Sequence, residues 1–477
     1  MARPAGLMTQ TVQALPAPAS NTARFQQMIV VALDGSGTYP SIAQALHEAA
    51  DGAMIRVRPG LYREALVIDR PVELIADGPA GSVVVESNSS ACLRVYGHPA
   101  AIRGFTFRCT AGSNGVECFG VQALGQVLLE DCDITCNSLA CVGVHGANAD
   151  PVVRRCRIHH GAQGGIVLYQ AARGVFEDCE FFDNALAAVD LREASGPVVR
   201  RCRISGGVTV FDRAHGRFEQ CEIIGGALPG IHVDSGGDPL VRECAIHHSK
   251  AAGVVVAGNG RGTFEECNIY SNALSGIEVK GNANPAVRRC GIRAGEQNGV
   301  MVWQSGRGIF EDCDVFGNAL AGIHVKEAGD PVVRRCGIHD SRGCGVTATS
   351  RGNGLFEECE IFANTLGGVE VSEGADPILR RCRIHHGRQG GVLVHTQGRG
   401  TIEDCDIFAD ARVGVASWEG GNPLFRRSRI HESKETGVLV FNGGRGVVEE
   451  CEFWGHGGRN IDVHPGCEVL QRAIVER

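Results

Sequence analysis

Five titratable side chains in the middle of the chain have the residue types that acid–base chemistry requires. They are two glutamates, two lysines and a histidine: Glu278, Lys280, His324, Lys326 and Glu370. Carboxylates can hold Ca²⁺ through oxygen ligands, and a lysine or a histidine can take a proton from a substrate. If the protein is an enzyme, these five residues are the candidate catalytic residues, provided that the surrounding elements bring them together.

A cysteine repeat sets the spacing of those elements. From Cys132 to Cys451 the cysteine returns every 23 residues, except for an interval of 24 at the start and one of 19 between Cys202 and Cys221. Ser428 takes the place of one cysteine. Such a fixed period is typical of a solenoid. Each period holds short β-branched runs between Gly, Asn and Asp turns, with no room for a helix of ten residues.

The sequence therefore predicts an all-β fold, a right-handed single-stranded parallel β-helix of about 15 coils with an N-terminal cap. "SIAQALHEAA" is a helical pattern that begins at a Ser N-cap and would cover the open end of the solenoid. We expect a disordered or loosely attached tail at 1–27, the cap and first coils at 28–100, the repeats at 101–465 and an end segment at 466–477.

Charged residues beside the cysteines alternate in sign from one coil to the next. Arg154 and Arg155 would lie beside Glu177 and Asp178, and the alternation continues to Glu450. Opposite charges on neighbouring strands stabilise by a few tenths of a kcal/mol to about 1 kcal/mol, and like charges destabilise. We interpret this ladder as a device that fixes the register of the coils.

The cysteines and histidines are also interpreted as structural. A thiol is a small hydrophobic group that suits an inward corner, whereas cysteine metal ligands converge as CxxC pairs. The histidines share one column with aromatic residues of the neighbouring coils, and most of them would be about 9.6 Å or more apart. We therefore predict no metal site and no cofactor. The column contains His159, His247, His339, His385 and His431.

One strand of each coil carries unmatched polar and aromatic residues on its outward side. In the pattern G-[IV]-x-[VL]-x the aliphatic residues should point inward, so the alternate residues should face solvent. Exposed aromatic residues are enriched in interfaces. The predicted binding residues on this strip are Tyr169, Asp190, Arg192, Phe211, Met301, Trp303, His395, Trp418 and Phe441. The five candidate catalytic residues lie on the same strip but on alternate coils, about 9.6 Å apart, which is wide for one Ca²⁺ site.

Two segments resemble known families. The two-coil unit "DPVVRRCGIHDSRGCGVTATSRGNGLFEECEIFANTLGGVEV" resembles the repeats of carbohydrate-binding and sugar-hydrolase β-helices, most closely those of F-box-only ubiquitin-ligase substrate receptors, although no F-box segment precedes it. The segment "VVALDGSGTYPSIAQALHEAADGAMIRVRPGLYREALVI" resembles the opening of pectin methylesterases and of pectate-lyase-like β-helices. The esterase motif "DFIFG" is absent, which disfavours that activity.

These features favour a non-catalytic cytoplasmic scaffold that recognises a macromolecule along the outward strip, a protein rather than a polysaccharide. The alternative is a polysaccharide lyase or hydrolase of the pectate-lyase-like group. A net charge of −8 does not favour nucleic acid, and no run of 18 apolar residues favours a membrane. The N-terminal segment lacks the pattern of a secretory signal, so we expect the 21 cysteines to be reduced. Association of two copies through the C-terminal coil is left open.

Overall fold

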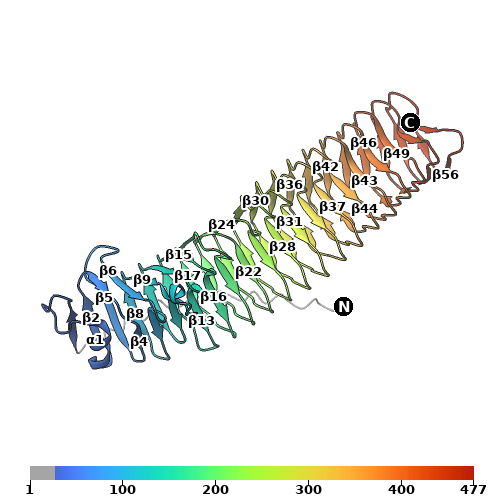
Figure 1. Ribbon diagram of the computed structural model, residues 1–477. Coiled ribbons are helices and arrows are strands. Elements are labelled where there is room, and N and C mark those ends of the chain that lie inside the picture. Colours follow the sequence, from blue (N-terminus) through green and yellow to red (C-terminus); the bar gives the residue numbers. More distant parts are fainter. Residues whose placement is uncertain (1–26) are drawn as a thin grey trace, which may run out of the picture.

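The computed structural model describes residues 27–477 and shows one long rod of stacked coils (Figure 1). The predicted tail at 1–27 therefore lies outside the described residues, apart from Gln27. Each coil contributes three short strands that pair in parallel with those of the coils before and after it. The predicted parallel β-helix is confirmed.

The strands form three parallel sheets that run the length of the rod. Sheet A begins at β1 (Met28–Val31) and contains 20 strands. Sheet B begins at β3 (Gly60–Tyr62), and sheet C begins at β4 (Leu66–Ile68). The rod thus has about 20 turns, more than the 15 expected from the cysteine spacing, because the first coils lack that repeat.

A typical coil consists of β35 (Ile309–Glu311), β36 (Asp314–Phe316) and β37 (Ile323–Val325), one strand in each sheet. Its strands pair with those of the next coil in a register of 23 residues, for example Ile323 with Val346. The last strands of the three sheets are β56 (Glu468–Arg472), β57 (Val475–Glu476) and β55 (Ile461–Val463).

The interior is filled by stacks of equivalent residues. In sheet A a large and a smaller side chain alternate along the axis, so that neighbouring coils interlock; examples are Phe264, Val287, Phe310, Val333 and Phe356, all buried. The predicted inward position of the cysteine stack is confirmed, because every cysteine except Cys467 is buried. Within this stack the amide N–H of Cys313 donates to Cys336 Sγ at 3.4 Å. Ser428 keeps the pattern, since its Oγ accepts from the amide N–H of Cys405 at 3.2 Å.

The charge ladder also forms as predicted. Arg334 lies between Glu357, at 3.1 Å, and Glu311, at 3.9 Å. Arg335 pairs with Asp312 of the preceding coil at 2.8 Å. Arg335 and Asp312 both have left-handed backbone angles, with φ of 51° and 55°, at the bend between sheets A and B. The ion pair therefore joins the same bend of two successive coils.

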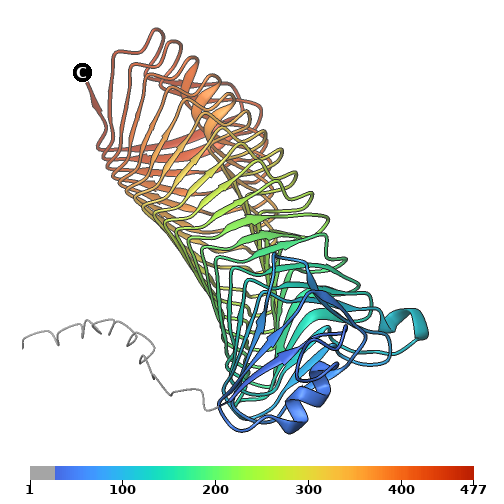
Figure 2. The ribbon, with the colours of Figure 1, turned by 90° about the vertical axis from the view of Figure 1, so that its left-hand side faces the viewer.

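The helix α1 (Ile42–Glu48) lies at the N-terminal end of the rod (Figure 2). It begins at Ser41, whose Oγ accepts the amide N–H of Gln44 at 3.2 Å. Its buried residues Ile42, Ala45 and Leu46 belong to the same apolar core as the first coils. None of the helices in residues 27–477 has the length and hydropathy needed to cross a membrane.

Candidate functional site

The single short coil of the repeat changes the surface of sheet C. Between β18 (Glu180–Phe182) and β19 (Val189–Leu191) the chain makes a turn of six residues, 183–188. In the next coil only Gly206 and Gly207 join β21 (Arg203–Ser205) to β22 (Val208–Val210). Both glycines have left-handed angles, with φ of 110° and 81°. We call the row of turns between sheets B and C, which borders sheet C along the rod, the rim. The rim is therefore interrupted at this coil.

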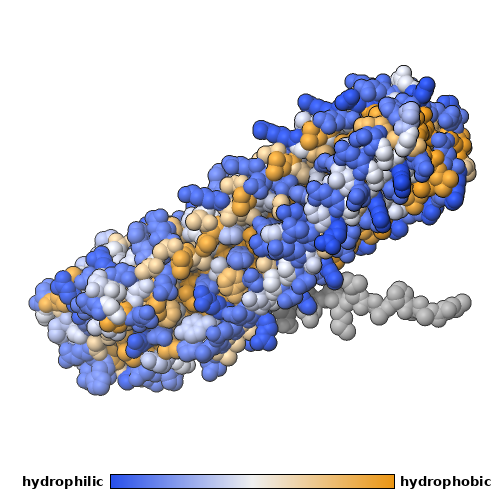
Figure 3. Space-filling model, turned by 45° about the vertical axis from the view of Figure 1, so that its right-hand side comes forward, coloured by the Kyte–Doolittle hydropathy of each residue, from blue (hydrophilic) through white to orange (hydrophobic). Residues whose placement is uncertain are grey.

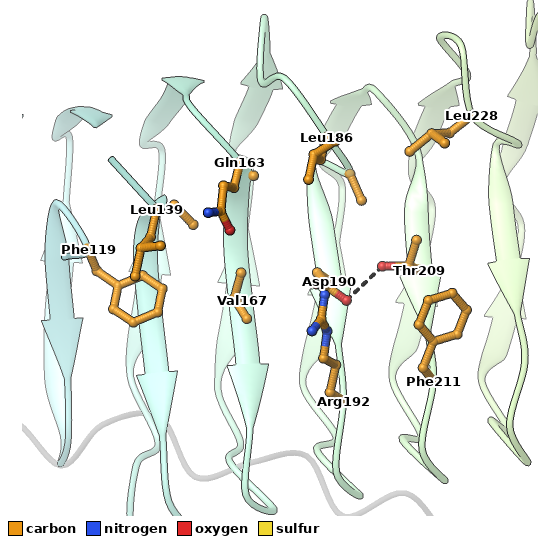
Figure 4. Close-up of a pocket in the computed structure, with 13 residues that line it drawn as sticks. Phe119, Leu139, Gln163, Val167, Leu186, Asp190, Arg192, Thr209, Phe211 and Leu228 are labelled. Carbon is orange, nitrogen blue, oxygen red and sulfur yellow. Dashed lines mark hydrogen bonds and ion pairs between the residues drawn. The ribbon is translucent and has the colours of Figure 1, made fainter. Parts of the chain in front are cut away.

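A cavity of about 250 Å³ lies on sheet C at this gap (Figure 4). Its floor consists of outward-facing residues of successive strands, and its upper border is made by residues of the turns between sheets B and C. We call this cavity the groove. It is lined by Phe119, Leu139, Ala140, Gln163, Gly164, Val167, Leu186, Ala187, Asp190, Arg192, Thr209, Phe211 and Leu228.

The polar centre of the groove is the carboxylate of Asp190 in β19. Thr209 Oγ1 donates to Asp190 Oδ1 at 2.8 Å, and Arg192 Nη2 lies 2.7 Å from Asp190 Oδ2. The hydrogen bond to Asp190 raises the pKa of Arg192, so the guanidinium stays charged. The Asp190 side chain is 12% exposed and that of Arg192 is 53% exposed. Further guanidinium N–H groups of Arg192 can therefore donate to a ligand.

Two phenylalanine rings mark the ends of the groove. A Cβ placed on Gly143, in β13 (Ala140–His145), would meet three Phe119 ring atoms at 2.6–2.8 Å, so the ring lies flat over this glycine. At the other end, the Phe211 ring is perpendicular to the ring of His232, at 5.1 Å between centroids. Both phenylalanine rings are seen broad side on in Figure 4. Each is partly exposed, so each offers an aromatic face above sheet C.

Sequence reasoning identified only part of this groove. Asp190, Arg192 and Phe211 were predicted and line it together, although Asp190 is buried rather than exposed on its strand. The turn residues and Phe119 were missed, because they lie outside the strand pattern. The interval of 19 residues between Cys202 and Cys221 was the signal that could have located the groove.

The five candidate catalytic residues do not converge on one centre. Lys280 Nζ pairs with Glu278 Oε1 at 2.9 Å, and the same Oε1 accepts from Trp303 Nε1 at 3.0 Å. The Trp303 ring lies between two lysines, with Lys280 Nζ 5.3 Å and Lys326 Nζ 5.0 Å from its centroid. Glu278, Lys280 and Lys326 are thus arranged around Trp303.

His324 and Glu370 bond to other residues. His324 Nε2 lies 3.1 Å from Thr349 Oγ1, and burial lowers the pKa of His324. Glu370 Oε1 lies 3.2 Å from His395 Nε2. The five residues therefore take part in separate contacts along sheet C, in line with the expectation that their positions on alternate coils hold them apart. Among residues 27–477 no three His, Cys, Asp or Glu side chains are placed to hold a metal ion.

The outward aromatic residues have partners that the repeat pattern did not predict. Trp418 stacks between His395, at 4.4 Å, and Phe441, at 5.6 Å between centroids. Tyr169 stacks on His145 at 4.7 Å. The expectation that these rings have no structural partners was wrong, because Trp418 and Tyr169 stack on rings of neighbouring coils, although both stay partly exposed. Met301 is also only partly exposed.

The histidine column on sheet B is confirmed. His339 stacks between Phe316, at 5.2 Å, and Phe362, at 4.5 Å. Its Nε2 lies 2.9 Å from Asp314 Oδ1, in the preceding coil. The column therefore belongs to the structure of the rod.

Comparison with known proteins places the chain in a family. The family model described as "Right handed beta helix region" matches residues 88–238, 229–376 and 321–472, well over half of the chain. The protein belongs to the right-handed β-helix family. The predicted handedness agrees with this membership.

A curated relative is a probable pectinesterase/pectinesterase inhibitor of Arabidopsis thaliana. It is 35% identical over 102 residues, and the match spans 18% of this chain and 18% of that protein. The likeness therefore covers a small part of either molecule.

Similar solved structures include a periplasmic alginate epimerase, 10% identical, covering 72% of this chain and 78% of the epimerase, with a TM-score of 0.40. Pectin methylesterase from carrot is 18% identical and covers 51% of this chain and 82% of its own, with a TM-score of 0.36. Neither is an F-box protein. At these identities and TM-scores the likeness supports no conclusion about the function of this chain.

Proposed function

We propose that this right-handed β-helix binds an oligosaccharide in the groove between Phe119 and Phe211. The observation that carries the proposal is the combination of two partly exposed aromatic faces with the bonded set of Asp190, Arg192 and Thr209. A pyranose ring offers apolar C–H faces and hydroxyl edges, so it matches aromatic faces with polar groups between them. The partial likeness to a probable pectinesterase supports this class of ligand.

The groove suits binding better than cleavage by paired carboxylates. Glycoside hydrolysis usually uses two carboxyl groups that flank the bond, and among residues 27–477 Asp190 is the one carboxylate that lines the groove. That carboxylate is already engaged by Thr209 and Arg192. A polysaccharide lyase or hydrolase remains the alternative, with Asp190 as its candidate acid or base.

The test is calorimetric titration with three probes: an oligogalacturonate, an oligomannuronate and a neutral cello-oligosaccharide. We expect binding of at least one probe, and a loss of about tenfold or more in affinity in the Phe119→Ala and Phe211→Ala variants. The matched control is Phe441→Ala, which removes a partly exposed ring of sheet C far from the groove. Unchanged affinity in both groove variants, or no binding of any probe, would contradict the proposal.

The same mixtures distinguish binding from catalysis. New reducing ends or unsaturated uronates, or methanol released from a methyl-esterified oligogalacturonate added as a fourth substrate, would favour the enzyme, and their loss in Asp190→Asn would assign the residue. We expect none of these products, because Asp190 is the only carboxylate among the described residues that line the groove, and it is already engaged by Thr209 and Arg192.

A second candidate function is recognition of a protein along the rim of sheet C. Figure 3 shows hydrophobic residues in a line along the rod. Five leucines at the equivalent position of every second coil are exposed, by 37–57% of their surface: Leu186, Leu228, Leu274, Leu320 and Leu366. Protein interfaces contain such apolar rows. A pull-down in which Leu274→Asp and Leu320→Asp lose a partner that the parent protein retains would favour this function. A cytoplasmic location and the closer resemblance to F-box-only receptors stay predictions.

A further inference from the structure

A cluster of thiols beside the groove departs from the linear cysteine stack. Cys109 ends β9 (Thr106–Cys109), and Cys118 lies in the segment that leads to β10 (Val121–Ala123). Their Sγ atoms are 3.4 Å apart. Elsewhere in the stack the cysteine thiols donate to backbone carbonyl oxygens, as Cys313 Sγ does to the carbonyl of Glu311 at 3.3 Å. The pair is therefore placed for chemistry between two thiols.

We propose that Cys109 and Cys118 form a reversible disulfide with a hydroperoxide as the oxidant, and that this bond fixes the segment that carries Phe119. A disulfide has an S–S length of about 2.05 Å, so the two sulfurs would approach by about 1.4 Å. Residues 111–117 contain a short 3₁₀ turn, Ala111–Asn114, and Gly115 with φ of 71°, and several of them are exposed. A surface turn of this kind can move by that distance without disturbing the stacked strands.

The reaction balances in two steps. The Cys109 thiolate attacks one peroxide oxygen and the O–O bond breaks, giving a sulfenic acid and hydroxide. The sulfur of Cys118 then displaces the sulfenic hydroxyl, and its thiol proton leaves with that hydroxyl as water. Two electrons pass from the two sulfurs to the peroxide. An added dithiol supplies two electrons to the disulfide and reduces it to the two thiols.

The surroundings assign the two roles. The neighbouring thiols of Cys136 and Cys92 lower the pKa of Cys109, which favours the thiolate. Burial raises the pKa of Cys118 to about 12, so Cys118 stays a thiol and serves as the resolving partner. Cys118 is 7% exposed and Cys109 is 2% exposed, so a small peroxide suits the site better than a bulky oxidant.

The disulfide would act on the groove through one peptide bond. Phe119 follows Cys118 directly, and its ring lies over Gly143 as one end of the groove. Movement of Cys118 therefore moves this aromatic face. The disulfide rests on the thiol geometry, whereas its effect on ligand affinity also rests on the proposed function.

The test is oxidation of the folded full chain with one equivalent of hydrogen peroxide, followed by alkylation and digestion. Cleavage at Arg108, Glu117 and Glu130 places the two thiols on different peptides, so mass spectrometry detects the cross-link directly. We expect a Cys109–Cys118 disulfide that dithiothreitol reduces. Cys290 and Cys313 should be recovered as alkylated thiols, which shows that they did not cross-link. A bond from Cys109 to Cys136 or Cys92, or no bond at all, would overturn the proposal.

Two variants separate the roles. In Cys118→Ser we expect dimedone to trap a sulfenic acid at Cys109. In Cys109→Ser we expect neither a dimedone adduct nor a disulfide. A dimedone adduct at Cys118 in Cys109→Ser would overturn the assignment. If the cross-link forms and no oligosaccharide binds in either redox state, the disulfide stands and the proposed function fails.

Discussion

At the residue scale, Asp410 is a buried acid in a position where other coils carry an amide. Asn364, two coils earlier, accepts the amide N–H of Ser341 through Oδ1 at 3.0 Å and donates through Nδ2 to Ile338 O at 3.1 Å. Asp410 Oδ1 accepts the amide N–H of Gly387 at 2.8 Å, but Oδ2 has no partner among the described residues. Burial raises the pKa of Asp410 to about 8. Below that pH the acid is neutral, as the amide is.

Asp410→Asn should therefore stabilise the protein at high pH. The pKa of Asp410 in the folded chain lies above the unfolded value of 3.8, so the carboxyl group binds its proton more tightly in the folded chain than in the unfolded chain. The free energy of unfolding therefore falls as the pH rises from about 4 to about 8. We expect the variant to gain several kcal/mol of unfolding free energy at pH 9 and little at pH 4, as measured by thermal unfolding followed by circular dichroism. Ser433→Ala in the next coil is the control. An equal effect at both pH values would show that Asp410 is not buried as an acid.

At the element scale, the repeat predicted the strands, the inward stacks and the charge ladder, because each depends only on residues one period apart. The groove depends on a departure from the period. Phe119 reaches Gly143 from a turn, and the rim is open where Gly206 and Gly207 replace a six-residue turn. Strand alternation correctly placed Trp418 on the outer side but did not show that His395 and Phe441 cover its faces.

Restoring the short turn should close the groove. Inserting Asn-Ala-Leu-Ala, the sequence of residues 184–187, between Gly206 and Gly207 would give this coil a turn of ordinary length. The new leucine would border Thr209, so we expect oligosaccharide affinity to fall about tenfold or more with the circular dichroism spectrum unchanged. The measurement is the same calorimetric titration.

The control for that insertion is the same four residues placed between Glu419 and Gly420, in an exposed turn remote from the groove. This variant should bind as the parent does. Full affinity after the insertion at Gly206 would show that the ligand does not use the interrupted rim.

At the scale of the whole molecule, the charge ladder determines which coil can lie on which. Each strand has nearly the same hydrophobic pattern, so apolar packing alone would tolerate a slip by one coil. The ion pairs would not, because a slip of one coil places arginine beside arginine. Arg334 and Arg335 lie in a basic coil between two acidic coils, and they contact Glu357 and Asp312.

The double variant Arg334→Glu, Arg335→Glu should lower the melting temperature through repulsion. It would place six carboxylates in three neighbouring coils, opposite Glu311, Asp312, Glu357 and Glu358. Because both arginine side chains are more than a third exposed, their attraction alone is worth little, and we expect most of the loss to come from the new repulsion.

The double variant Arg334→Gln, Arg335→Gln is the matched control and should lose much less stability. Repulsion is screened in 1 M salt, where the Debye length is about 3 Å, so salt should restore most of the melting temperature of the glutamate variant. A loss that is equal in both variants and independent of salt would show that the ladder packs the coils rather than selecting their register.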